Sequence, residues 1–499
     1  MLEGILGQLN WTTCIILLIV AWLWTLVPKR RKGIPHGPPV FPIFGNIPSL
    51  ISRDPLDAFT ALRNKYGDLY GLFVGQEFTV IINGYDAIHE ALVKKGDIFA
   101  KRPRSEFHQL MFKDPGIVFA NGEAWRQNRK FTQMALNEFG YGWTEKTMEE
   151  RINEEVIHFI QEVEQQTEAF NIGEIVNLSV ANVISGILFG QRSDYKDPQF
   201  VACLNSVGEA AELFTRSSLL MSCFPILKKF PGDFLGLKKI EEVREKPKTF
   251  LKSVCSRHAE SYDELKERRN VMDLYRREIS SKKDNVDGNI FNETHMRVLM
   301  GELLSAGSET TATCVIWIIL YLIKDVSLQK RLQADIDDVI GTERQPTLND
   351  RKRLAYVEAT ILEGLRIAPV APLSVPHAVH EDTMFRGFLI PKETTVLVNL
   401  HSVLKDPATW DEPESFRPER FLDNTDNITI PKEFIPYSAG RRACLGESLA
   451  RMELFLYITA LLQKFDIAPE NPESLENIKG NLGMTYSPSP FKVKLTPRR

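Results

Sequence analysis

The stretch of the sequence best suited to chemistry is YSAGRRACLG, Tyr437 to Gly446, which places one thiol beside two arginines and two glycines. The residues after it have the apolar spacing of an amphipathic helix, so Cys444 is expected at a helix N-terminus. Free N–H groups and the positive end of the helix dipole stabilise a thiolate there, and Arg441 and Arg442 add positive field. Such a thiolate can act as a nucleophile or as a metal ligand.

Three roles compete for this cysteine. A nucleophile needs a histidine base and an orienting partner, and neither lies close in the sequence. A metal ligand needs small neighbours that let a bulky cofactor approach, and Gly440, Ala443 and Gly446 provide them. A buried structural cysteine is the default for any single thiol, but it does not explain the glycines. The residues therefore favour a ligand for a metal-containing cofactor.

The pattern Gly440-x-Arg442-x-Cys444-x-Gly446 resembles the haem-binding signature of the cytochrome P450 monooxygenases. The resemblance implies that the Cys444 thiolate binds the iron of haem b, where a thiolate pushes electron density onto the metal and favours O–O cleavage. It also implies that Gly440, Gly446 and Arg442 contact the cofactor, with Arg442 paired to a propionate. The family usually has phenylalanine where this chain has Tyr437, whose hydroxyl needs a partner.

A second motif, AGSET (Ala306 to Thr310), resembles the oxygen-binding motif of the same family. Thr310 lies four residues after Ala306, so its hydroxyl can bond to that carbonyl and loosen the helix. The resemblance implies that Thr310 and Glu309 are catalytic, transferring protons during oxygen activation, and that Ala306 contacts the haem. An ordinary solvated helix face is the alternative, and the apolar flanks fit it poorly.

Four further residues match positions that contact haem propionates in the family. Trp125 and Arg129, in WRQNR, lie four residues apart on one helix face, where an indole N–H and a guanidinium can donate together. Arg102, in AKRP, and His377, in VPHAV, match the other two positions. Each alone would be a surface charge or a core histidine, and their order around the cysteine strengthens the resemblance.

EGLR, Glu363 to Arg366, resembles the E-x-x-R pair of the family. Three residues apart, the two side chains share one helix face. The resemblance adds Arg420, in FRPERF, to form a buried polar network. We expect this network to be structural and not catalytic.

The scaffold that would position these residues is predicted to be mainly α-helical with small β-sheets. From about residue 50 helical patterns dominate, while Leu69 to Asn83 and Thr394 to Leu400 alternate as strands do. The longest apolar helix, about Asn292 to Lys324, carries polar residues that favour a core helix over a membrane span. The expected architecture is a single cytochrome P450 fold preceded by an N-terminal transmembrane helix.

The N-terminus predicts an uncleaved membrane anchor. Residues 11–27 carry no charge, and Lys29 to Lys32 follow them as four basic residues, so the C-terminal flank belongs in the cytosol. A cleaved signal peptide or a hydrophobic first helix of a soluble domain would be the alternatives, but a signal peptide has its charges before the apolar run. The expected segments are a lumenal N-terminus (1–10), a transmembrane anchor (11–27), a basic and proline-rich hinge (28–46) and a cytosolic catalytic domain (47–499). The expected location is the cytoplasmic face of the endoplasmic reticulum membrane, in microsomes.

Composition limits the partners. With 61 basic and 65 acidic residues the net charge is −4, so nucleic acid is not an expected partner. No G-x-G-x-x-G follows a predicted strand, so electrons must come from another protein. The resemblance implies NADPH–cytochrome P450 reductase, with cytochrome b5 as a second candidate, and the expected basic contacts are Arg126, Lys130, Lys432 and Arg441.

The residues in and around these motifs most resemble those of family 2 of the microsomal enzymes, near the fatty-acid epoxygenase branch. Predicted pocket walls, residues 107–119, 370–375 and 484–487 with Ala306, are mostly apolar or hydroxylic. The expected substrates are small hydrophobic molecules: xenobiotics, fatty acids such as arachidonic acid, or steroids. A peroxide isomerase or dehydratase and a non-catalytic haem protein are the competing hypotheses, and intact Glu309 and Thr310 argue against the first.

Overall fold

The computed structural model describes residue 15 and residues 25–51, 54–111, 116–140, 147–230, 232–263, 269–281, 290–483 and 485–498. The predicted transmembrane anchor, residues 11–27, therefore lies outside the described residues apart from 15 and 25–27. The predicted pocket-wall residues 112–115 and 484 also lie outside them.

The chain is mainly helical, as the sequence predicted. The α-helices are α3 (Ile47–Ile51), α4 (Pro55–Tyr66), α5 (Tyr85–His89), α6 (Gly96–Phe99), α7 (Glu106–Met111), α8 (Gly122–Gly140), α9 (Met148–Glu164), α10 (Ile172–Phe189), α11 (Pro198–Cys223), α12 (Leu237–Ser261), α13 (Val271–Ser281), α14 (Glu293–Lys324), α15 (Val326–Val339), α16 (Ala355–Ile367), α17 (His401–Leu404) and α18 (Glu447–Lys464). Shorter helical segments are the π-helix η1 (Glu90–Lys94) and the 3-10 helices η2 (Pro225–Lys229), η3 (Leu348–Lys352), η4 (Pro418–Phe421), η5 (Gly440–Arg442) and η6 (Pro472–Asn477).

The described β-structure is small. The strands are β1 (Leu69–Val74), β2 (Glu77–Ile82), β3 (His377–Ala378), β4 (Thr383–Phe385), β5 (Phe388–Ile390), β6 (Thr395–Val398), β7 (Phe465–Pro469), β8 (Gly480–Leu482), β9 (Tyr486–Pro488) and β10 (Val493–Pro497). One sheet has four strands in the order β1-β2-β6-β3, and β7 with β10, β4 with β5 and β8 with β9 form two-stranded sheets. The β1–β2 hairpin turns at Gly75, whose φ of 61° suits glycine.

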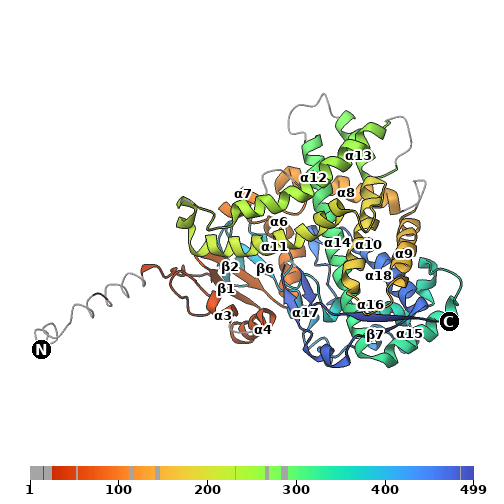
Figure 1. The fold of residues 1–499 in the computed structure, drawn as a ribbon. Helices are drawn as coiled ribbons and strands as arrows, with labels where there is room; N and C mark the ends of the chain where they lie inside the picture. The colour runs from red at the N-terminus through yellow and green to blue at the C-terminus, as the bar shows by residue number, and fades with distance from the viewer. Residues whose placement is uncertain are drawn as a thin grey trace, which may run out of the picture.

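Helix α14 runs through the middle of the helical body and organises the core (Figure 1). It packs against α10, α12, α16 and α18, while the sheet of β1, β2 and β6 lies with α3 and α4 on the side of the N-terminus. Among the described residues, α10 and α14 are long and apolar enough to cross a membrane, but most of each is buried inside the protein. The prediction of a core helix at 292–324 is therefore confirmed.

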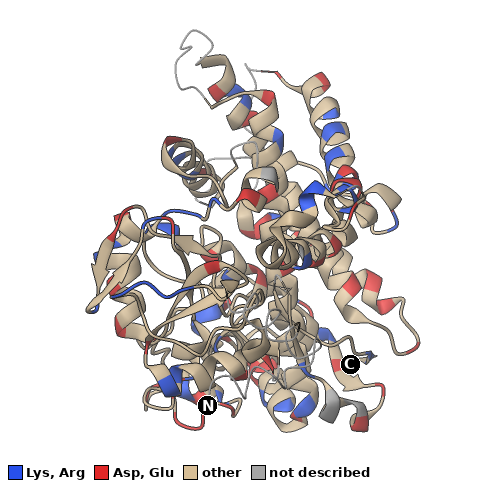
Figure 2. Cartoon of the chain, turned by 90° about the vertical axis from the view of Figure 1, so that its left-hand side faces the viewer, with Lys and Arg blue, Asp and Glu red and all other residues tan. Residues whose placement is uncertain are grey.

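Local sequence explains where the core helices begin. The side chain of Asn292 accepts a hydrogen bond from the N–H of His295 at 2.9 Å and caps α14. Asn171 caps α10 in the same way, and α10 ends at Gly190, whose φ of 72° is the left-handed conformation that glycine favours. Basic and acidic residues are interspersed over the elements seen in Figure 2, in line with the small net charge.

Candidate functional site

Cys444 lies between η5 and α18, at the point the sequence predicted. Its N–H donates to the carbonyl of Tyr437 at 3.0 Å, which closes the loop. The residue is exposed, although much of the helix that follows it is buried. The surrounding protein raises the pKa of the Cys444 thiol, while N–H groups of Gly446 and Glu447 and the Arg129 guanidinium act to lower it.

This balance bears on what the thiol can do. Burial is the larger effect, and it acts against the thiolate that the helix N-terminus favours. A metal cation bound directly to the sulfur deprotonates a thiol outright. A cysteine that acts as a metal ligand is therefore a thiolate even where burial disfavours the charge. Among the described residues, no group of three or more His, Cys, Asp or Glu could hold a metal ion by itself. The site suits a metal carried by a cofactor, with Cys444 as its protein ligand.

The two glycines of the loop differ in what they do. Gly440 has a φ of 73°, and a Cβ there would lie 2.0 Å from the carbonyl oxygen of Leu92 in η1. Packing against η1 therefore requires this glycine, whereas the sequence interpretation gave it only the task of making room for a cofactor. At Gly446 a Cβ would meet the sulfur of Cys444 at 3.9 Å, an ordinary contact. The described surroundings therefore do not require glycine at this position, and a role for Gly446 in making room for a cofactor stays a prediction.

Arg102, Arg129 and Arg442 lie near this loop, and none of them forms an ion pair with an acidic residue in the part of the chain that the structure describes. Arg102 donates to the carbonyls of Val118, Val375 and Pro376 at 2.8 to 3.0 Å, and it is 5% exposed. Burial, with repulsion from Arg129, lowers the pKa of Arg102 to about 9. No acidic group raises that pKa in the described structure.

Arg442 occupies a similar environment. It donates to the carbonyls of Ala100, Ile117 and Ala120 at 2.6 to 3.2 Å, and its guanidinium lies 3.9 Å from the ring centroid of Trp125. Burial, with repulsion from Arg102 and Arg129, lowers the pKa of Arg442 to about 8. Arg129 itself donates to the carbonyl of Ala443 at 2.9 Å, and burial lowers its pKa too.

Two neighbouring side chains hold spare hydrogen-bonding capacity. The indole Nε1 of Trp125 is buried and has no partner among the described residues. His377 donates from Nδ1 to the carbonyl of Phe99 at 2.8 Å, which leaves Nε2 available. Burial, with repulsion from Arg102 and Arg442, lowers the pKa of His377 to about 3, so the ring is neutral at physiological pH.

These observations fit a haem. One buried and two half-buried guanidinium groups, with an unpartnered indole N–H, suit a compact group with two negative charges, as haem propionates provide. Cys444 would be the ligand of its iron. Arg102, Arg129, Arg442 and Trp125 would hold its propionates, with His377 beside them.

The oxygen-binding motif has the expected local geometry. Thr310 donates its hydroxyl proton to the carbonyl of Ala306 at 2.7 Å, four residues back along α14. Ala306 is exposed, whereas most of the apolar side chains of α14 are buried. Glu309 accepts at Oε1 from the hydroxyl of Thr485 at 2.8 Å. Gly307 allows close packing on α10, because a Cβ there would lie 2.7 Å from Ile184.

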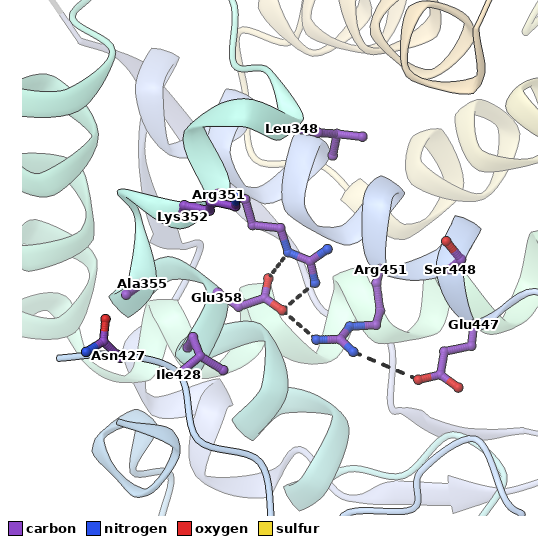
Figure 3. Close-up of a pocket in the computed structure, with 10 residues that line it drawn as sticks. All are labelled: Leu348, Arg351, Lys352, Ala355, Glu358, Asn427, Ile428, Glu447, Ser448 and Arg451. Atoms are coloured by element: carbon purple, nitrogen blue, oxygen red, sulfur yellow. Dashed lines mark hydrogen bonds and ion pairs between the residues drawn. The ribbon is translucent and has the colours of Figure 1, made fainter. Parts of the chain in front are cut away.

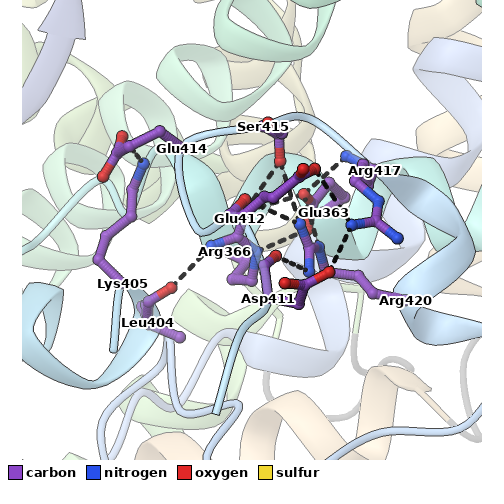
Figure 4. Close-up of polar contacts among 10 residues, drawn as sticks. All are labelled: Glu363, Arg366, Leu404, Lys405, Asp411, Glu412, Glu414, Ser415, Arg417 and Arg420. Atoms are coloured by element: carbon purple, nitrogen blue, oxygen red, sulfur yellow. Dashed lines mark hydrogen bonds and ion pairs between the residues drawn. The ribbon is translucent and has the colours of Figure 1, made fainter. Parts of the chain in front are cut away.

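The predicted network of Glu363, Arg366 and Arg420 is present and buried (Figure 4). Arg366 binds both oxygens of Glu363, at 2.6 and 2.8 Å, and both side chains are fully buried. Arg420 adds a bond to Glu363 at 3.1 Å and donates to the carbonyls of Asp411, Glu412 and Ser415. The network joins α16 to η4 and the loop before it, which confirms a structural arrangement.

Tyr437 remains the departure from the family pattern. Its hydroxyl is buried without a hydrogen-bond partner among the described residues. Burial, with the nearby Cys314 and Cys444, raises its pKa well above the usual range, so the hydroxyl stays protonated. A neutral phenol beside the sulfur is therefore what this chain has in place of an apolar ring.

A surface groove of about 830 Å³ lies apart from the cysteine side chain, between η3, α16 and the first turns of α18 (Figure 3). Four of the five charged residues that line it, all but Lys352, form ion pairs with one another. Glu358 accepts from Arg351 and from Arg451, and Arg451 lies 3.9 Å from Glu447. We assign this cluster to holding α18 against α16.

Sequence reasoning missed the contacts of three side chains that shape the site, one of which, Thr485, it had placed only in a predicted pocket wall (484–487). Asn121 accepts from the N–H of Arg102 at 2.7 Å and donates to its carbonyl, which fixes the backbone of that arginine. Glu302 accepts from the N–H groups of Ile117 and Val118 at 2.5 and 2.9 Å and ties α14 to the loop before α8. Thr485 binds Glu309. The sequence marked Glu302 only as a polar break in an apolar helix.

The four basic residues expected to meet an electron donor are all exposed. Arg441 pairs with Asp97 at 2.7 Å, while Arg126 and Lys432 have acidic neighbours at 3.6 and 3.8 Å. Lys130 has no ion pair among the described residues.

The chain matches the family model Cytochrome P450 over residues 35–495. It is 34% identical to cytochrome P450 2U1 of Rattus norvegicus, covering 97% of this chain and 94% of that protein. It is 35% identical to cytochrome P450 2D4 of Rattus norvegicus over 99% of both chains, and 34% identical to cytochrome P450 2B4 of Oryctolagus cuniculus over 97% and 99%. The chain therefore belongs to the cytochrome P450 family, in its microsomal family 2, and is a haem-dependent monooxygenase.

Proposed function

We propose that this monooxygenase takes electrons from NADPH–cytochrome P450 reductase and uses O2 to hydroxylate or epoxidise hydrophobic substrates. Cytochrome b5 is a second candidate donor. The substrate classes we propose are xenobiotics, fatty acids such as arachidonic acid, and steroids. Association with the endoplasmic reticulum membrane follows from the microsomal family, and the anchor at residues 11–27 supports the cytoplasmic face.

The observation that carries this proposal is the arrangement of Thr310 and Glu309 on α14, to which we assign proton transfer. Thr310 donates to the Ala306 carbonyl, so its oxygen is free to accept a hydrogen bond from a water molecule. Glu309 is held at Oε1 by Thr485, which leaves Oε2 to carry a proton. When bound, haem supplies the redox chemistry that activates O2 at its thiolate-ligated iron. A peroxide isomerase would need neither Glu309 nor Thr310 for proton delivery.

Aromatic packing supports a hydrophobic substrate. Phe107 of α7 meets Phe214 of α11 with ring centroids 4.7 Å apart, and Phe119 meets His108 at 5.6 Å. Burial lowers the pKa of His108, so this histidine adds a neutral ring and no charge. The described part of the predicted wall, residues 107–111 and 116–119, thus contributes aromatic rings, which favour apolar and aromatic molecules.

The proposal is tested with purified protein, the reductase and a panel of the three substrate classes. NADPH and O2 should be consumed together with formation of an oxygenated product. Thr310→Ala should lower product formed per NADPH by about tenfold to a thousandfold and release more hydrogen peroxide. Conversion of a substrate without NADPH and O2 would contradict the proposal and favour an isomerase.

A further inference from the structure

Glu309 is held by a residue far away in the chain. Its Oε1 accepts a hydrogen bond from the hydroxyl of Thr485 at 2.8 Å, across 176 positions of sequence. Thr485 is 6% exposed, so water competes poorly for this bond. Among the described residues, Glu309 makes no other side-chain hydrogen bond.

The turn that carries Thr485 is fixed independently of that bond. It joins β8 to β9, and the N–H of Gly483 donates to the carbonyl of Thr485 at 3.0 Å. The next residue, Tyr486, donates from its N–H to the carbonyl of Val370 and accepts from Trp317 Nε1, both at 2.8 Å. The Trp317 and Tyr486 rings stack with centroids 5.4 Å apart. The hydroxyl therefore sits on a rigid support.

We propose that Thr485 is a positioning residue that holds the Glu309 carboxylate in the orientation needed for proton transfer. This inference rests on the proposed function of Glu309. A glutamate side chain has several rotatable bonds, and a free carboxylate spreads over many orientations. The hydroxyl of Thr485 fixes Oε1 as an acceptor, so Oε2 is the oxygen that gains and loses the proton. Each proton passes from solvent to Oε2 and onward to the oxygen being reduced, and the carboxylate is regenerated.

The first test compares Thr485→Val with the wild type. Valine keeps the branched shape and removes the hydroxyl, so the turn should stay in place. Product formed per NADPH should fall about threefold to tenfold, with hydrogen peroxide rising to match, because the carboxylate is no longer held. The dissociation constant for substrate, measured from the change in the haem absorption spectrum, should stay within about twofold. Thr485→Ser should restore coupling.

Two controls separate positioning from folding. Ser489→Ala removes hydroxyl bonds at the other end of the same hairpin, to Lys479 and Asn481, and should leave coupling at the wild-type value. In a Glu309→Gln background, which has no proton to transfer, Thr485→Val should cause no further loss of coupling. A Thr485→Val enzyme as well coupled as the wild type, or an equal further loss in Glu309→Gln, would overturn the inference.

A measurement without turnover tests the contact itself. The losses in thermal unfolding midpoint caused by Thr485→Val and by Glu309→Ala should not add in the double variant. The double variant should be as stable as the less stable of the two single variants. Additive losses would contradict the contact. If the wild type oxidises nothing with NADPH and O2, the proposed function fails. If the wild type is well coupled and Thr485→Val equals it, the positioning role alone fails.

Discussion

Replacing Glu363 by glutamine should destabilise the fold more than any surface change of the same kind. Glu363 is fully buried and accepts four hydrogen bonds: two from Arg366 at 2.6 and 2.8 Å, one from Arg420 at 3.1 Å and one from the N–H of Arg417 at 2.8 Å. Glutamine has nearly the same size, so cavity formation adds little. It removes the negative charge and turns one acceptor into a donor that faces guanidinium groups.

The expected magnitude follows from burial. The side chains of Arg366 and Arg420 are 0% and 8% exposed, and Glu363 is their carboxylate partner among the described residues. Removing one member of a buried, hydrogen-bonded ion pair costs about 3–5 kcal/mol. With a denaturant slope of about 3 kcal/mol per molar in urea, the unfolding midpoint should fall by about 1 M.

The assay is urea unfolding followed by circular dichroism, with Glu412→Gln as the matched control. Glu412 lies 3.3 Å from Arg417 and its side chain is 64% exposed, so its removal should cost less than about 1 kcal/mol. The carbonyl that Glu412 offers to Arg420 is unchanged in this control. A Glu363→Gln midpoint equal to that of Glu412→Gln would refute the reasoning about burial.

Three further outcomes are expected. Reversing Arg126 and Lys130 to glutamate should slow reductase-driven turnover about tenfold and spare peroxide-driven turnover, whereas equal losses would count against docking there. In haem-free protein the pKa values of Arg102 and Arg442, about 9 and about 8, lie below the 12.5 of an unfolded chain, so the unfolded state binds more protons between these values. Stability should therefore rise as pH increases above 8, and the rise should shrink when both become glutamine. Glu302→Gln should speed amide hydrogen exchange at residues 117 and 118 about tenfold, because one hydrogen-bonding charge is lost.

Much of the fold was predictable because its signals are local. The polar residues within the apolar run of α14, and the asparagine that caps it, are signals in the sequence itself. The predicted helix at 292–324 differs from the observed Glu293–Lys324 by one residue. The alternating run at residues 69–83 became β1 and β2, joined at Gly75. What the sequence did not predict is the parallel pairing of β2 with β6, which aligns Thr79 with Thr395. Such long-range register depends on tertiary packing and not on a local pattern.

The candidate site was also predictable only where its signals are local in the sequence. Cys444, Thr310 and the arginines were found because motifs carry them, and their neighbours were missed because the contacts join distant segments. The bonds of Thr485 to Glu309 and of Glu302 to the loop before α8 span 176 and about 185 positions. Gly440 shows a third case, since its motif was recognised but its contact with Leu92 needed coordinates.

The central claim is that Cys444 is the thiolate ligand of a haem iron, and the absorption spectrum of the reduced, CO-bound protein tests it most directly. The wild type should show the red-shifted Soret band that thiolate ligation produces, and Cys444→Ala should lack it while keeping its fold by circular dichroism. A wild-type spectrum without the red-shifted band, or the same band in Cys444→Ala, would contradict the account.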